Sequence, residues 1–187
     1  MTITATPGRS PRWRLRPLAP GDLGWVISRH GSIYAEEFGW DATFEYEVAG
    51  IAADIMKRFD PGRENAWIAE RDGVRLGAVF LVQANAETAK LRRLIVDPAA
   101  RGLGIGARLV AECTIFARNA GYRRITLWTH SVLVAARRLY TAAGYRLIPT
   151  IGMFDRSRKE ASASFLKKRS KKLFIRLASR DAGQGGA

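Results

Sequence analysis

The chain has 187 residues, of which 47% are hydrophobic, so we expect one domain with a sizeable core and short extensions. Its single cysteine, Cys113, rules out an internal disulfide framework, and no group of cysteines and histidines indicates a zinc site. No apolar run approaches the roughly 18 residues of a membrane span, and the N-terminus lacks a signal-peptide core, so we expect a cytoplasmic protein. The net charge of +14 is concentrated in residues 156–180, which hold ten Lys and Arg against one acid, Glu160.

Hydrophobic periodicity and turn residues divide the chain into strands and helices after an N-terminal segment, residues 1–11, that we expect to be disordered. In chain order the predicted elements are a strand at 13–18, a helix from Asp22 that ends before Gly39, a helix at 42–59, strands at 66–70, 76–82 and 89–96, a helix at 105–120, a strand at 124–129, a helix at 132–143, a strand at 145–148 and a last strand near 172–177.

Local signals indicate where several of these elements begin and end. Asp22 is placed to cap the first helix, and Gly121 is typical of a helix C-terminus. Asp72-Gly73 between two strand patterns indicates a two-residue hairpin. Antiparallel hairpins therefore come first, and one right-handed strand-helix-strand crossover follows. The sequence predicts an α/β (α+β) fold, with a mixed, mostly antiparallel sheet of six to seven strands and about four helices on its two faces.

The most informative segment, Leu94–Ala107, joins an apolar strand to an amphipathic helix through a turn. Gly102, Gly104 and Gly106 alternate there with larger residues, so side chains do not crowd the backbone N–H groups. N–H groups at a helix N-terminus attract anions through hydrogen bonds and the helix dipole. The segment therefore predicts a site for a diphosphate.

Two familiar phosphate-binding turns fit this segment poorly. A P-loop requires Gly-Lys before Ser or Thr, whereas Gly106 is followed by Ala107-Arg108. The glycine spacing also fits a dinucleotide-binding turn, but residues 98–101 separate the glycines from the strand. The next strand, 124–129, offers no acid for a ribose, and the dinucleotide unit usually opens a domain rather than following half of the chain.

A third pattern, Arg101-x-x-Gly104-x-Gly106, is similar to the acetyl-coenzyme A (acetyl-CoA) motif of the GNAT (GCN5-related) N-acetyltransferase family. A second stretch on the next predicted helix, Ala136-x-x-Leu139-Tyr140-x-x-x-Gly144-Tyr145, resembles the family's second signature. The order of elements from Arg12 to Ile148 also resembles that of the family.

The resemblance implies a GNAT fold for residues 12–155, with a sheet that splays between its fourth and fifth strands. A basic C-terminal segment, 156–187, then includes the last strand and a disordered tail. The resemblance also implies that the pantetheine arm of acetyl-CoA pairs with the fourth strand at Leu94, Ile95 and Val96. The other cofactor-binding residues that it implies lie on the turn and are Arg101, Gly102, Leu103, Gly104, Ile105, Gly106 and Ala107.

Two side chains are candidates for the chemistry. Tyr140 matches the family tyrosine that is proposed to protonate the leaving thiolate, and it also contacts the cofactor; the alternative is a core aromatic. A hydroxyl near the sulfur can donate a proton or stabilise the developing charge. His130 ends the fifth strand and is a candidate general base, or a partly exposed residue beside Ser131.

The first two helices roof the acceptor site in this family and carry further candidates. Glu36, Glu37 and Glu47 could act as the base, or they are simply solvated. Tyr34 and Trp40 could line an acceptor pocket, or they pack the helix pair.

A narrower resemblance links the segments 34–41, 67–73 and 126–129 to the acetyltransferase half of bacterial MarR–GNAT fusion proteins. The chain also departs from the family. Leu133 stands where the second signature often begins with asparagine, which removes a polar contact to the cofactor. The basic run Lys167–Lys172 lies in a segment that usually shapes the acceptor site, and it indicates an anionic acceptor or a surface role.

We therefore expect an acyltransferase that moves acetyl from acetyl-CoA directly to a primary amine of a small molecule or peptide, with no metal. Many family members dimerise, so the resemblance allows a homodimer. One alternative is an acyl-CoA-binding module without turnover, motivated by Leu133. Another is a nucleic-acid-binding protein that uses the basic segment, which is disfavoured because only Phe165 and Phe174 offer aromatic platforms there.

Overall fold

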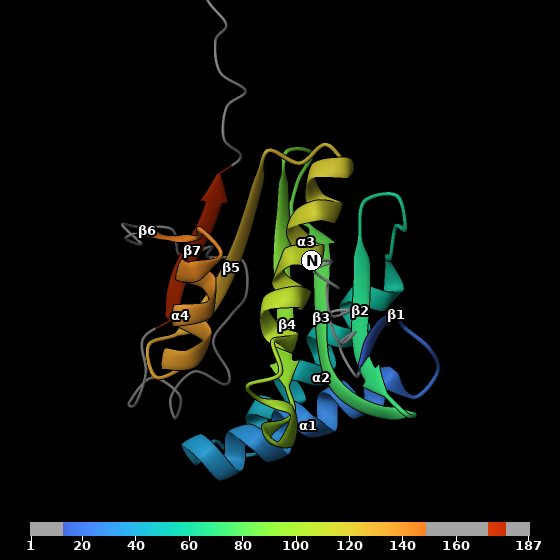
Figure 1. The fold of residues 1–187 in the computed structure, drawn as a ribbon, viewed down its shortest axis with the longest axis vertical. Helices are drawn as coiled ribbons and strands as arrows, with labels where there is room; N and C mark the ends of the chain where they lie inside the picture. The colour runs from blue at the N-terminus through green and yellow to red at the C-terminus, as the bar shows by residue number, and fades with distance from the viewer. Residues whose placement is uncertain (1–12, 149–171, 179–187) are drawn as a thin grey trace, which may run out of the picture.

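The computed structural model describes residues 13–148 and 172–178, which form four helices, seven strands and one short 3-10 turn, η1 (Figure 1). No helix among these residues is both long enough and apolar enough to cross a membrane. The N-terminal segment 1–11 and the basic run 167–171 lie outside the described residues. In chain order the elements are β1 (Arg14–Pro17), α1 (Asp22–Phe38), α2 (Ala42–Lys57), β2 (Asn65–Arg71), β3 (Val74–Gln83), β4 (Thr88–Val96), η1 (Pro98–Ala100), α3 (Ile105–Asn119), β5 (Arg124–His130), α4 (Val134–Ala142), β6 (Arg146–Ile148) and β7 (Lys172–Ala178).

The strands form one sheet in the order β1-β2-β3-β4-β5-β7-β6. β4 and β5 run parallel and are joined by the crossover helix α3, whereas the other five neighbouring pairs are antiparallel. The α+β architecture with a mixed, mostly antiparallel sheet and four helices is thus confirmed.

β4 and β5 pair only along their first halves. The pairing runs from Thr88 opposite Arg124 to Leu91 opposite Leu127. Beyond it, β4 stays paired with β3 as far as Val96, and β5 stays paired with β7 as far as His130. Each strand therefore keeps its outer neighbour, and Figure 1 shows the two separating toward the end of the sheet where α1 lies.

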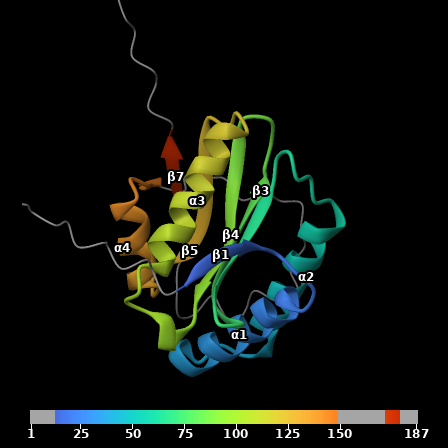
Figure 2. The same ribbon diagram turned by 45° about the vertical axis from the view of Figure 1, so that its right-hand side comes forward.

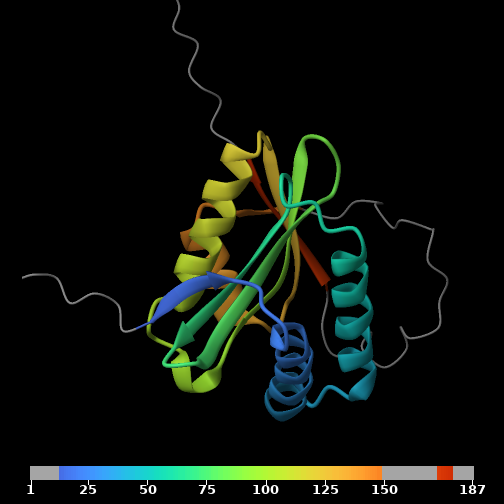
Figure 3. The same cartoon turned by 90° about the vertical axis from the view of Figure 1, so that its right-hand side faces the viewer.

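Two apolar cores hold helices on opposite faces of the sheet. On one face, Leu109 and Cys113 of α3 pack with Leu81 and Leu127, and α4 joins the same cluster. On the other, α1 and α2 contribute Val26, Ile33 and Ile55 against Ile68 and Phe80. Figure 3 shows the sheet between α3 and α2, and Figure 2 shows α1 lying across one end.

Asp22 does not cap α1, so that expectation is wrong. Gly21 is the N-cap residue, with φ of 88°, and Asp22 is the first helical residue. The Asp22 carboxylate is fully buried and accepts hydrogen bonds from Arg16, Arg75 and the backbone N–H of Ala19. Its role is therefore to join β1, β3 and the start of α1 through an ion-pair network.

The other element ends differ from expectation by a few residues. α2 ends at Lys57 rather than at 59, because the C-cap residue Arg58 already has a non-helical backbone. At the start of α2, the Asp41 side chain accepts a hydrogen bond from the N–H of Thr43 at 2.9 Å. Such a cap satisfies one of the N–H groups that lack helical partners.

Candidate active site

The turn between β4 and α3 presents backbone N–H groups. Gly102 and Gly104 have φ of 81° and 76°, a region that side chains disfavour, so glycine is required to make this turn. Gly104 is the N-cap of α3 and gives no side-chain cap. Within the described structure, the N–H groups of the first turn, Ile105–Ala107, are thus left open to an anion.

α1 and Trp13, the residue before β1, hold this turn in place. Arg29 of α1 pairs with Asp97 at 2.8 Å, and Asp97 also accepts the N–H of Ala99 at 3.0 Å to begin η1. Arg101, the first residue of the acetyl-CoA motif, pairs with Glu37 at 2.6 Å. The indole N–H of Trp13 donates to the carbonyl of Leu103 at 3.3 Å. Among the glutamates that the sequence proposed as bases, Glu37 therefore serves as an anchor for the turn.

The second half of β4 offers an open edge and a bulge. From Arg92 to Val96, the edge that faces β5 carries no strand pairing in the described structure. On the β3 side, Ala78 pairs with Ile95 and Phe80 with Arg92, so β4 holds one extra residue. Arg93 lies at this bulge with φ of 52°, which is unusual for a residue other than glycine. The bulge turns the backbone just before Leu94, where the thioester arm is expected.

Close packing at Gly106 joins the turn to α4. A Cβ atom built on Gly106 would lie 3.1 Å from Cδ2 of Leu139 and 3.6 Å from Cγ2 of Val96. The end of β4, the start of α3 and the residue before Tyr140 therefore meet at one point. Two of the sequence signatures, which lie far apart along the chain, are brought together here.

Tyr140 lies on α4 with only 5% of its surface exposed. Its ring centroid is 5.9 Å from that of Tyr145. Burial raises the pKa of the Tyr140 phenol far above its usual range, with smaller contributions from Tyr34 and Tyr145. The phenol thus keeps its proton at physiological pH and can act as a hydrogen-bond donor.

His130 lies at the end of β5, on the opposite side of the gap from β4. Its ring packs edge-to-face against Trp40, with centroids 4.8 Å apart. Trp40 belongs to an aromatic cluster with Tyr34, Phe38 and Phe44 at the corner between α1 and α2. Tyr34 and Trp40 thus pack the helix pair, one of the two roles considered for them.

The other histidine, His30, is a structural residue of α1. Its Nδ1 lies 2.8 Å from the carbonyl of Val26, one turn earlier. Burial lowers the pKa of His30 to about 4, so the ring is neutral at physiological pH. Cys113 is likewise fully buried, and burial raises the pKa of its thiol, which keeps it unreactive.

A profile of the Acetyltransferase (GNAT) family matches residues 30–145, well over half of the chain. The chain belongs to the GNAT family. Its matched domain is that of an acetyl-CoA-dependent N-acetyltransferase, and acetyl-CoA is the co-substrate.

Individual GNAT relatives match parts of the chain. An uncharacterized N-acetyltransferase of Schizosaccharomyces pombe is 32% identical over 115 residues, which cover 60% of this chain and 70% of the relative. N-acetylaspartate synthetase of Danio rerio is 32% identical over 109 residues, but these cover 58% of this chain and only 38% of that protein. The acetyltransferase yncA of Salmonella typhimurium, solved with its cofactor acetyl-CoA, has the same fold, with a TM-score of 0.66 at 17% identity over 94% of this chain and 99% of that one.

Sequence reasoning did not identify Arg93, or the bulge that carries it, as part of the site. Its guanidinium lies over the Phe44 ring at 5.9 Å and donates to the carbonyl of Glu47 at 3.3 Å. The residue therefore connects the most irregular point of β4 in this GNAT domain to α2. A bulge inside an apolar strand leaves no mark in composition or spacing, so no signal in the sequence pointed to it.

Proposed function

We propose that this GNAT domain moves an acetyl group from acetyl-CoA directly to a primary amine, in the gap between β4 and β5. One observation carries the proposal. The open edge of β4, the uncapped first turn of α3 and the helix that bears Tyr140 converge where Gly106 meets Leu139.

The residues around this point fit acetyl-CoA. The N–H groups of Ile105, Gly106 and Ala107 would hold the diphosphate, together with the backbone of residues 101–104. The unpaired edge of β4 from Leu94 to Val96 would pair with the amides of the pantetheine arm, as an added strand does. Glycine at 106 lets the start of α3 lie directly against Leu139 of α4 and Val96 of β4, which holds these three elements together at the site.

Acetyl-CoA supplies an activated acetyl thioester, so that a C–N bond forms as the C–S bond breaks. Tyr140 would donate a hydrogen bond to the departing sulfur and stabilise its developing negative charge. Because burial raises the pKa of Tyr140, the hydroxyl is a weak acid and keeps its proton. The thiolate then takes its proton from solvent, while the proton lost by the amine goes to the base.

His130 is the candidate for that base. It ends β5 across the gap from Leu94, and its ring is only partly buried against Trp40. A neutral imidazole at this position could accept the amine proton directly or through a water molecule. Glu36 is exposed on α1, and Glu47 binds Arg93 through its backbone carbonyl, so neither glutamate shows a contact that favours it over His130.

Several finer expectations from the sequence remain proposals. They are the domain limits 12–155, a cytoplasmic location, a small-molecule or peptide acceptor, the allowed homodimer, and the narrower likeness to MarR–GNAT fusion proteins. One relative is named for N-acetylaspartate synthesis and another for mycothiol acetylation, so the names of the relatives do not select one acceptor.

A thermal-shift titration tests the cofactor assignment. Acetyl-CoA should raise the Tm, because a ligand at 100 times its Kd adds about 2.7 kcal/mol to the free energy of unfolding. NADP, which carries a diphosphate, and ATP, which carries a triphosphate, lack the pantetheine arm; they serve as controls and should raise the Tm little. Stabilisation by NADP but not by acetyl-CoA would contradict the proposal.

A second candidate is an acyl-CoA-binding module without turnover, and Leu133 favours it. Leu133 is the N-cap of α4 and provides no side-chain hydrogen bond to the first turn. Restoring a polar cap with Leu133→Asn should stabilise α4 by about 1 kcal/mol and tighten acetyl-CoA binding. Binding of acetyl-CoA without thiol release across an amine panel would establish the module instead.

A further inference from the structure

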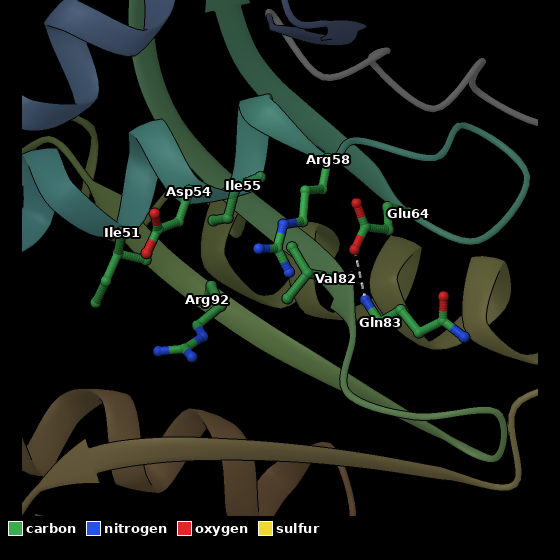
Figure 4. A pocket seen from close by; sticks show the side chains of 8 residues that line it. All are labelled: Ile51, Asp54, Ile55, Arg58, Glu64, Val82, Gln83 and Arg92. Atoms are coloured by element: carbon green, nitrogen blue, oxygen red, sulfur yellow. Dashed lines mark hydrogen bonds between the residues drawn. The ribbon is translucent and has the colours of Figure 1, made fainter. Parts of the chain in front are cut away.

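A cavity of about 310 Å³ opens on the α2 face of the sheet. Its walls come from the second half of α2, the end of β3, the loop before β2 and the middle of β4 (Figure 4). Two guanidinium groups lie in it, Arg58 from the end of α2 and Arg92 from β4. Pockets of this size hold small ligands, and a few polar groups usually fix their orientation.

Neither guanidinium has a partner in the described structure. Arg58 and Arg92 form no ion pair or hydrogen bond among these residues, whereas Arg16, Arg29 and Arg101 each bind a carboxylate. Arg92 is also half-buried, and burial lowers the pKa of its guanidinium, although the group stays charged. A half-buried guanidinium that forms no ion pair among the described residues is placed to bind a ligand of opposite charge.

The charges around Arg92 are mostly positive. Lys90 stands two residues earlier on the same face of β4, and burial together with Arg92 lowers the pKa of the Lys90 ammonium to about 8. Arg93 follows directly, and it too feels the charge of Arg92. Two acids, Asp54 and Glu64, line the same cavity. An anion placed beside Arg92 would relieve the repulsion among these cations.

Glu64 does not supply that anion. Its Oε1 accepts the backbone N–H of Gln83 at 2.8 Å, and its Oε2 accepts the N–H of Asp60 at 3.3 Å. Figure 4 shows the hydrogen bond between this carboxylate and the backbone N–H of Gln83. Through these two hydrogen bonds, Glu64 connects the loop before β2 to the end of β3.

The cavity adjoins the proposed reaction site. Arg92 is the first residue of β4 beyond the pairing with β5, which ends at Leu91. It precedes Leu94 by two residues, a distance of roughly 7 Å along a strand. A molecule held by Arg92 could therefore reach the gap between β4 and β5 with a group only a few bonds away.

We infer that the amine acceptor carries a carboxylate, which Arg92 and Arg58 bind in this cavity. A planar carboxylate matches the two parallel N–H groups of a guanidinium, and such pairs are among the strongest hydrogen bonds in proteins. The acceptor class is thus a small amino acid rather than a neutral amine. This inference rests on the proposed acetyl transfer.

Matched acceptor pairs test the inference with the 187-residue chain and acetyl-CoA. The pairs are L-alanine with L-alaninamide, β-alanine with β-alaninamide, and L-aspartate with its diamide. The amino group of an amino-acid amide is less basic than that of the parent acid, so more of it is unprotonated and ready to react. Intrinsic reactivity therefore favours the amide, and a preference of the enzyme for the acid shows that the carboxylate is bound. We expect the acids to have the higher kcat/KM, and Arg92→Gln to raise their KM by about 10- to 100-fold, the loss of one charge-assisted hydrogen bond. Aminomethylphosphonate is included as a probe for phosphate-like anions.

Further variants separate binding from folding. Arg58→Gln lies at an exposed helix end, so it should fold normally and should also raise the KM of the acids. Arg71→Gln, at the far end of β2, is the matched control and should change neither the KM of the acids nor the KM of the amides. Equal use of acids and amides, unchanged KM values in both cavity variants, or a preference for the phosphonate would overturn the inference while leaving acetyl transfer intact. Binding of acetyl-CoA without acetylation of any amine would overturn the proposed function and this inference together.

Discussion

Gly106 of α3 and Leu139 of α4 are in such close contact that a Cβ atom at position 106 would lie 3.1 Å from Cδ2 of Leu139. This contact sets the distance between the diphosphate turn and the helix that carries Tyr140. The terminal methyl of a leucine can move by a few tenths of an ångström, so alanine is tolerated at this position. A larger, branched side chain would separate the two helices.

We predict that Gly106→Val raises the Kd of acetyl-CoA at least about tenfold, whereas Gly106→Ala changes stability by less than about 1 kcal/mol, because helix propensity offsets the tighter contact. Gly50→Ala is the matched control in α2, where nothing lies within 4 Å of an added Cβ. It should stabilise the protein by roughly 0.5–1 kcal/mol without changing the Kd. Calorimetric titration measures the Kd of acetyl-CoA, and chemical denaturation measures the free energy of unfolding. A Gly106→Val variant with wild-type affinity for acetyl-CoA would contradict the account.

Tyr140→Phe tests the hydrogen bond to the leaving sulfur. Turnover should fall by about 10- to 100-fold, while the KM of acetyl-CoA changes little, because the ring packing is kept. Tyr46→Phe, at a side chain that is 78% exposed, should have no effect. Because burial raises the pKa of Tyr140 above its ordinary value of 10.0, the wild-type rate should also show no decline near pH 10 from loss of this proton. A Tyr140→Phe enzyme of full activity would remove Tyr140 from the chemistry.

Asp22→Asn tests the buried ion pairs at the start of α1. Burial alone would raise the pKa of this carboxyl, but hydrogen bonds from Arg16 and Arg75 outweigh burial and hold it well below its ordinary value of 3.8. A carboxyl whose pKa is lower in the folded than in the unfolded state stabilises the protein when the pH is above the pKa of the unfolded state. This contribution to the free energy of unfolding fades as the pH falls below about 4. The variant should lose about 2–4 kcal/mol at pH 7 and progressively less below pH 4. Asp41→Asn, at an exposed cap, should cost little because asparagine caps equally well; equal losses for both variants at pH 7 would refute this role.

The bulge at Arg93 makes a prediction about backbone strain. At φ of 52°, glycine fits better than any other residue, so Arg93→Gly should be more stable than Arg93→Ala by about 1 kcal/mol. Val74 in β3 is the control, where glycine should be less stable than alanine by a similar amount. Urea denaturation of the four variants gives their free energies of unfolding. If alanine is more stable than glycine at position 93 as well as at position 74, the backbone at the bulge is not strained.

The order of elements and the mixed sheet were predictable because apolar periodicity and turn glycines depend on residues that are close together in the sequence. The turn at residues 101–107 was predictable for the same reason, since the φ angles of Gly102 and Gly104 demand glycine. Asp22 was mistaken for a cap because its partners, Arg16 and Arg75, come from strands that only folding brings beside it. Arg58 and Arg92 lie 34 positions apart in the sequence, so no local pattern could reveal the cavity that they share.

Amine-dependent release of the CoA thiol tests the central claim most directly. With acetyl-CoA and a saturating primary amine, the wild-type protein should release one thiol for each acetylated amine detected by mass spectrometry, and Tyr140→Phe should slow both signals equally. Tight binding of acetyl-CoA with no thiol release above the rate of hydrolysis, across amino acids, their amides and peptide amines, would contradict the account.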